Sequence, residues 1–99
     1  MYSKRVTPAG RRALNEWLAA PTDEWTELRD PGLLQLFLGA DPQALAEVQL
    51  RTHRAKLAEY EELHRTSDFG GLPGPRLALE AGLAHEREWV RFWERLADG

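Results

Sequence analysis

The stretch that decides the fold is residues 42–65, PQALAEVQLRTHRAKLAEYEELHR. It contains no glycine and, after its first residue, no proline, so nothing in it interrupts a helix. Apolar side chains recur at helical spacing and mark one face: Leu45, Val48, Leu50, Leu57, Tyr60 and Leu63. We therefore predict one helix over 42–65, about 36 Å long at a rise of 1.5 Å per residue.

A second long helix follows after a short break. Residues 66–75 hold three glycines and two prolines, which predicts the loop of a hairpin. Residues 76–97 then show two apolar stripes: Leu79, Leu83, Val90 and Trp93, and beside them Ala81, Trp89, Phe92 and Leu96. Gly82 lies inside this helix, where glycine costs about 1 kcal/mol relative to alanine, so we expect another backbone to approach closely there.

Toward the N-terminus, a capping residue precedes proline three times, at Thr7-Pro8, Asp30-Pro31 and Asp41-Pro42. Such a side chain accepts a bond from a free first-turn N–H, and proline has no N–H to leave unpaired. The pairs predict short helices over 8–20 and 31–38, with a polar loop over 21–29 between them. The helix over 31–38 is apolar nearly all round, so we expect it to be buried on several sides.

The chain is accordingly predicted to be a single all-α domain over 1–99, with four helices, two short ones followed by a long antiparallel helical hairpin. Its 99 residues exclude large barrels, doubly wound sheets and two-domain enzymes. The absence of cysteine excludes disulfides and thiol nucleophiles. A net charge of −3 argues against nucleic-acid binding by this chain alone. No stretch has the ~18 apolar residues of a membrane span, and no signal-peptide pattern is present, so we expect a cytoplasmic protein. Arginine far outnumbers lysine, which favours a bacterial source.

No residue pattern predicts catalysis or metal binding. His53 and His64 share a helix face but are roughly 16 Å apart along the axis, too far to share an ion. His85 lies on another helix, and Pro73 and Pro75 remove amides that a phosphate-binding loop would use. We expect no metal, no cofactor and no enzyme activity.

The helix lengths favour a homodimer. A compact chain of this size has a radius of gyration of only ~13 Å, and two short helices cannot cover both faces of a long hairpin. Exposed apolar patches usually mark interfaces, and a twofold dimer buries the same patch twice. We predict that the interface is formed by Leu83, Trp89, Val90, Trp93 and Leu96. The alternative is a site for a small aromatic ligand, lined by Trp17, Phe37, Tyr60 and Trp89.

The segment around the first predicted helix resembles a known junction motif. Tyr2 is followed by Thr7-Pro8-Ala9-Gly10-Arg11-Arg12-Ala13-Leu14-Asn15-Glu16-Trp17-Leu18, and then by Pro21. This is similar to the Thr-x-x-Gly-Arg-x-x-Leu-x-x-Trp-Leu segment of PadR-family transcriptional regulators. The rest resembles their C-terminal domain of the virulence-activator alpha type, including Arg29, the segment 33–37 and Glu88-Trp89.

The resemblance implies a dimerisation and effector domain of a PadR-like regulator, whose long helices form the homodimer. Residues 1–6 would be the remnant of a wing strand, and the winged-helix domain that precedes it in the family is missing. DNA reading is therefore not carried over to this chain. Some members respond to phenolic or drug-like molecules, so a stand-alone module for an aromatic ligand is the alternative. A further possibility is a truncated partner that forms heterodimers with a full-length PadR-like regulator.

Overall fold

The computed structural model describes residues 7–99, and the predicted wing-strand remnant at 1–6 lies outside this range. The described part holds four α-helices and no strand. They are α1 (Pro8–Ala19), α2 (Pro31–Phe37), α3 (Pro42–Thr66) and α4 (Pro73–Ala97), with a short 3₁₀ turn η1 (Phe69–Gly71) between α3 and α4. The all-α prediction is confirmed for these residues.

The three predicted helix starts are confirmed, each with the expected capping bond. The Thr7 hydroxyl accepts from the Gly10 N–H at 3.0 Å. The carboxylates of Asp30 and Asp41 accept from the N–H groups three residues on, also at 3.0 Å. Each cap satisfies one of the first-turn donors that have no partner inside the helix.

The start of α4 differs from the prediction. The helix begins at Pro73, so Pro73-Gly74-Pro75 forms its first turn instead of ending the loop. First-turn N–H groups have no partner inside a helix, so prolines are tolerated there. The connection that remains is short, and it turns through left-handed backbone at Phe69, Gly70 and Gly71.

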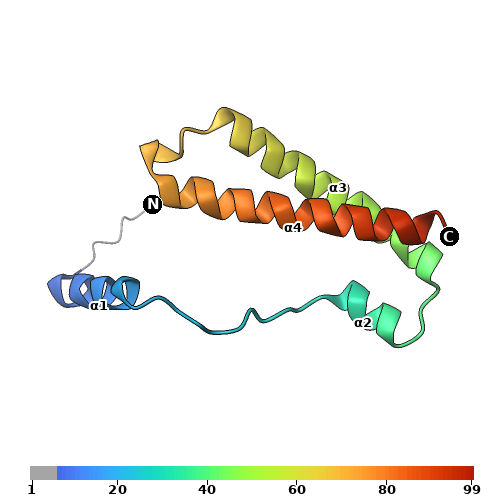
Figure 1. The fold of residues 1–99 in the computed structure, drawn as a ribbon, viewed down its shortest axis with the longest axis horizontal. Helices are drawn as coiled ribbons and strands as arrows, with labels where there is room; N and C mark the ends of the chain where they lie inside the picture. The colour runs from blue at the N-terminus through green and yellow to red at the C-terminus, as the bar shows by residue number, and fades with distance from the viewer. Residues whose placement is uncertain (1–6) are drawn as a thin grey trace.

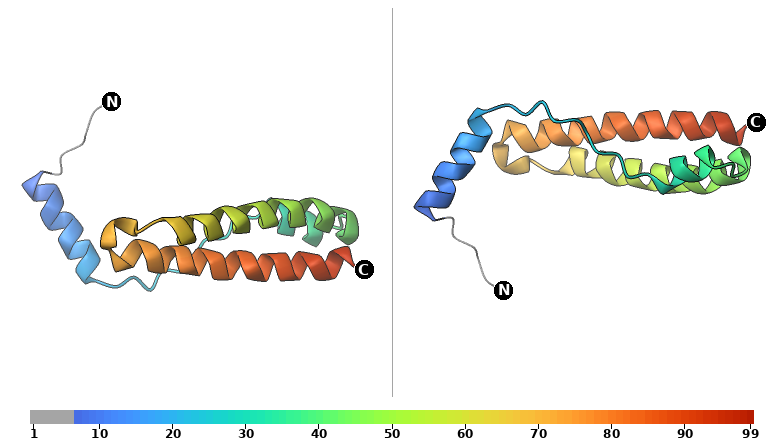
Figure 2. Two further views of the ribbon diagram at one scale, coloured as in Figure 1. Left: turned by 90° about the horizontal axis from the view of Figure 1, so that it is seen from above. Right: turned by 90° about the horizontal axis from the view of Figure 1, so that it is seen from below.

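Helices α3 and α4 lie side by side over most of their length and run in opposite directions (Figures 1 and 2). Their packing is consistent with the predicted antiparallel hairpin. The molecule measures 56 × 32 × 29 Å and has a radius of gyration of 18.5 Å. A compact chain of this length would be near 13 Å, so the fold is elongated.

The core lies where α2 crosses the open end of the α3–α4 pair. Its buried members are Ala46 and Leu50 from α3 and Trp93 from α4, with Leu33 and Leu36 of α2 packed against them. Only one side of α2 contributes, since Leu34, Phe37 and Leu38 are exposed. The expectation that this helix is buried on several sides is wrong for the single chain, because no element covers its outer face.

Helix α1 stands apart from the rest. It makes no contact with another described helix, and none of its residues is buried. Residues 20–30 connect it to α2 as an extended segment without helix or strand (Figure 1). Within residues 7–99, no helix combines the length and the apolar character that crossing a membrane requires.

Candidate functional site

The five residues predicted for a dimer interface lie in or against the core of the single chain. Trp93 is 0% exposed and Leu83 is 4% exposed, so neither offers surface to a second copy. Trp89, Val90 and Leu96 are half-buried and pack against the core cluster. Trp93 and Leu83 are thus covered within the single chain, while the interface between copies predicted for these five residues stays a prediction.

The four aromatic residues predicted for a ligand site are not brought together. Trp17 and Phe37 are exposed on α1 and α2, which do not touch each other. Tyr60 lies on α3 against Gly82, where an added Cβ would approach the ring to 3.1 Å. Trp89 stacks on the His53 ring with centroids 5.9 Å apart. The close approach expected at Gly82 thus exists, but a side chain and not a backbone makes it.

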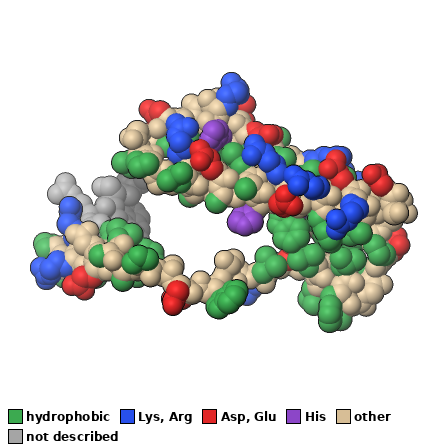
Figure 3. Space-filling model, in the orientation of Figure 1, with side chains coloured by type: hydrophobic (Ala, Val, Ile, Leu, Met, Phe, Trp, Pro, Cys, Tyr) green, Lys and Arg blue, Asp and Glu red, His purple; other side chains and the backbone are tan. Residues whose placement is uncertain are grey.

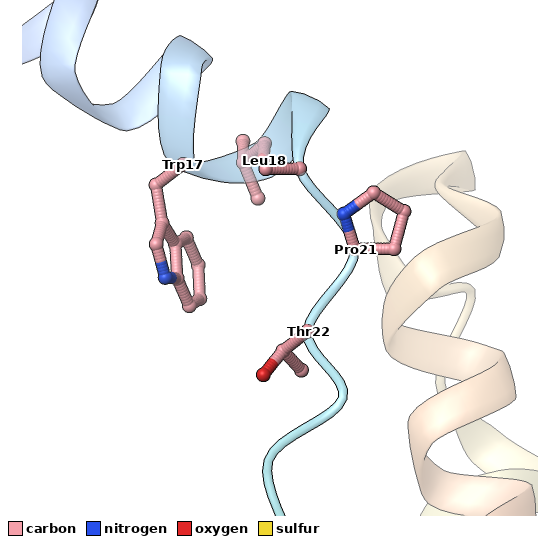
Figure 4. Close-up of a pocket in the computed structure, with 5 residues that line it drawn as sticks. Trp17, Leu18, Pro21 and Thr22 are labelled. Atoms are coloured by element: carbon pink, nitrogen blue, oxygen red, sulfur yellow. The ribbon is translucent and has the colours of Figure 1, made fainter.

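A shallow hollow lies at the C-terminal end of α1 (Figure 4). It has a volume of about 170 Å³ and is lined by Trp17, Leu18, Ala20, Pro21 and Thr22. Small-molecule pockets usually span ~300–1,000 Å³ and draw residues from several elements. This hollow is smaller and is formed by one continuous segment, so it does not provide the enclosed aromatic site of the alternative hypothesis.

Charged pairs connect α3 to α4 along their length. His53 Nδ1 lies 2.6 Å from Glu86 Oε2, and both side chains are largely shielded from solvent. His64 pairs with Glu80 at 3.2 Å, and Arg54 donates to Glu94 at 2.9 Å near the open end. The three pairs join α3 to α4 at separate points along the hairpin.

No group of three or more His, Asp or Glu side chains in residues 7–99 is placed to hold a metal ion. Three arginines at i, i+4 and i+8 on α4 have partners in the chain: Arg87 lies 3.9 Å from Glu61 of α3, Arg91 pairs with Glu88, and Arg95 lies over the Phe92 ring.

Two matching apolar triplets are left exposed by the part of the chain that the structure describes. On α1, the exposed large apolar side chains are Leu14, Trp17 and Leu18; on α2 and its cap they are Leu34, Phe37 and Leu38. Both sets have i, i+3, i+4 spacing, so each forms one helix face. Apolar side chains gather over both helices in the space-filling view (Figure 3). We call them the α1 triplet and the α2 triplet.

The two triplets are visible in the sequence, because both short helices contain the pattern Leu-x-x-aromatic-Leu, at 14–18 and at 34–38. The interface prediction instead favoured the larger aromatic content of the last helix. What the pattern alone does not give is exposure, since any apolar triplet at this spacing could equally face its own core.

The charges around the two triplets have opposite signs. Helix α1 carries Arg11 and Arg12 against a single acid, Glu16. Residues 30–50, which include α2 and the start of α3, carry Asp30, Asp41 and Glu47 and no basic side chain. Along the sequence, the α1 triplet is therefore bordered by net positive charge and the α2 triplet by net negative charge.

The family comparison assigns the larger part of the chain. Residues 28–98 match the family model described as virulence activator alpha C-term. The chain therefore belongs to the virulence activator alpha C-terminal family, a domain type associated with transcription regulators. The matched range covers α2, α3 and α4 and leaves α1 outside it. Comparison with curated proteins gave no match, and neither did comparison with solved structures.

Proposed function

We propose that this chain is the dimerisation and effector domain of a PadR-like transcriptional regulator. Two observations from different parts of the chain support this. Residues 28–98 belong to the virulence activator alpha C-terminal family. In front of them, Thr7, Gly10, Arg11, Leu14 and Trp17-Leu18 resemble the segment that joins the winged helix to this domain in PadR-like regulators.

The observation that carries the proposed dimer is the imbalance between a small core and a large exposed apolar surface. Within residues 7–99, the buried hydrophobic residues are Ala46, Leu50, Leu83 and Trp93. Twelve large hydrophobic side chains of the same range are exposed, and six of them form the α1 and α2 triplets. Contiguous apolar patches on a soluble chain usually mark interaction sites, and twofold pairing buries one patch on each copy.

On this proposal the chain performs no catalysis and does not contact DNA itself. Its partner is a second copy, or a full-length PadR-like regulator that carries the same domain. The separation of Trp17, Phe37, Tyr60 and Trp89 gives no specific support to an aromatic-ligand module, which we therefore do not propose as a second function.

Light scattering coupled to size exclusion tests the dimer directly. At micromolar concentration we expect twice the chain mass of 11.3 kDa, and a mass of one chain across that range would contradict the proposal. A pull-down with a full-length PadR-like regulator as bait then distinguishes a second copy from a full-length regulator as the partner. Retention of this chain by the bait supports heterodimers, whereas no retention supports a homodimer only.

A further inference from the structure

We propose that α1 of one copy docks its apolar triplet onto the α2 triplet of a second copy, and that the second copy returns the same contact. This inference rests on the proposed dimer and specifies which surfaces form it. A reciprocal exchange of this kind is closed, because each of the two copies supplies one α1 and one α2.

Helix α1 is an amphipathic helix that contacts no other helix within residues 7–99. Trp17, in its last turn, is 68% exposed. An isolated helix of 12 residues is marginal in water, since most helical stability in proteins comes from packing of an apolar face. A surface that receives this face therefore stabilises both the contact and the helix.

The α2 triplet fits as that surface in shape and in charge. Phe37 is 86% exposed and lies between two exposed leucines, as Trp17 does on α1. Arg11 and Arg12 beside one triplet face Asp30, Asp41 and Glu47 around the other when the two helices pair. Complementary borders favour this pairing over α1 with α1 or α2 with α2, which would bring like charges together.

The linker favours docking on a second copy over docking within the chain. Residues 20–30 contain no glycine and include Pro21, and Ala20 itself has extended backbone. The whole segment is extended and separates α1 from α2 along the molecule (Figure 1), so the α1 triplet does not reach the α2 triplet of its own chain in this structure.

The contact is large enough to matter for a dimer. A buried aromatic side chain removes ~150–250 Å² from solvent, and a reciprocal contact buries two tryptophans and two phenylalanines with their flanking leucines. Stable interfaces bury about 1,200–2,000 Å² in total. The two triplet contacts therefore account for much of such an interface.

The cysteine-free sequence makes a direct cross-linking test possible. One full-length chain carries Ala13→Cys, beside the α1 triplet, and another carries Gln35→Cys, beside the α2 triplet. The two are mixed, treated with a short bis-maleimide and analysed by mass spectrometry. Each chain has one thiol, so a product that joins the two variants can only form between copies.

We expect the mixed product to dominate over both homotypic products. Adding Trp17→Ala to the first chain should reduce it at least tenfold, whereas Trp25→Ala should not, because Trp25 lies in the linker, 95% exposed and outside both triplets. A chain that carries both cysteines, treated at nanomolar concentration, tests docking within one copy. Efficient cross-linking there would overturn the exchange.

The outcomes separate this inference from the proposed function. A dimer by light scattering without the mixed product, or with the Ala13→Cys homotypic product dominant, overturns the exchange and leaves the dimer in place. A single-chain mass at all concentrations overturns the proposed dimer itself.

Discussion

Trp93 is the side chain on which the single chain depends most. It is fully buried and contacts Ala46 and Leu50 of α3, while Phe92 packs edge-on at a centroid distance of 4.9 Å. Its Nε1 is buried without a hydrogen-bond partner among the described residues. An unsatisfied buried donor costs about 1–3 kcal/mol, so the ring's packing has to outweigh that cost.

The Trp93→Ala variant should lose about 3–5 kcal/mol of unfolding free energy, the usual cost of removing a buried aromatic ring. Urea denaturation followed by circular dichroism measures it. Trp25→Ala is the control, since Trp25 is almost fully exposed and surface changes usually stay within ±0.5 kcal/mol. Equal losses in the two variants would contradict the placement of Trp93 in the core.

The pair His53–Glu86 should contribute more to stability than Arg54–Glu94, although both connect α3 to α4. The side chain of Glu86 is 16% exposed and that of Glu94 is 47% exposed, so water competes less for the first pair. We expect Glu86→Ala to cost about 1–2 kcal/mol and Glu94→Ala less than about 0.5 kcal/mol. Denaturation of the two variants at the same pH decides it, and a larger loss for Glu94→Ala would contradict the ranking.

For single residues, the sequence predicted which side chains form the apolar face of α4, but not which part of the protein covers that face. The spacing of Leu83, Val90 and Trp93 on one stripe was visible, and the stripe exists. Spacing does not distinguish a face turned to the chain's own helix from one turned to a second copy. Trp93, which is predicted at an interface between copies, is buried in the core of the single chain.

Among the elements, helix starts were predictable because a cap is a local interaction. Asp41 and Pro42 determine the start of α3 through contacts that involve only residues 41–44, so the rest of the molecule is not needed for it. The start of α4 was missed because Leu72 provides no capping side chain and Pro73-Gly74-Pro75 has the composition of a loop. Prolines are nevertheless tolerated in the first turn of a helix, whose N–H groups have no partner inside it.

The capping bond of Asp41 should contribute measurably to the stability of α3. Asp41→Ala removes the bond to the Ala44 N–H and should lower the unfolding free energy by about 1 kcal/mol. Asp41→Asn should cost little, because asparagine accepts the same bond. Thermal unfolding of both variants measures the difference. If the two variants melt at the same temperature, the carboxylate is not acting as a cap.

For the whole molecule, the proposed dimer makes stability depend on concentration. A second copy that binds only the folded chain stabilises it by mass action. We expect the melting temperature to rise when the protein is concentrated from 1 μM to 100 μM, roughly a hundredfold in partner. Calorimetry over this range measures it, and a constant melting temperature would contradict a dimer that stabilises the fold.

Molecular shape was partly predictable from length. Two helices of the predicted extent imply an elongated molecule, and the dimensions agree with that. The position of α1 was not predictable, because within residues 7–99 it contacts no other helix that would place it. The predicted aromatic ligand site stays a prediction: its four residues lie on separate helices, and only tertiary packing brings such residues together.

The uneven exposure of the tryptophans gives the molecule its own optical reporters. Indole emission shifts to shorter wavelength in an apolar surrounding. Buried Trp93 should therefore emit at the shortest wavelength and exposed Trp25 at the longest. Trp93 reports unfolding of the α3–α4 core. Trp17 begins exposed, so its emission would move toward that of Trp93 as α1 docks. In a chain in which Trp25 and Trp89 are replaced by phenylalanine, a shift in Trp93 emission would report unfolding and a shift in Trp17 emission would report assembly.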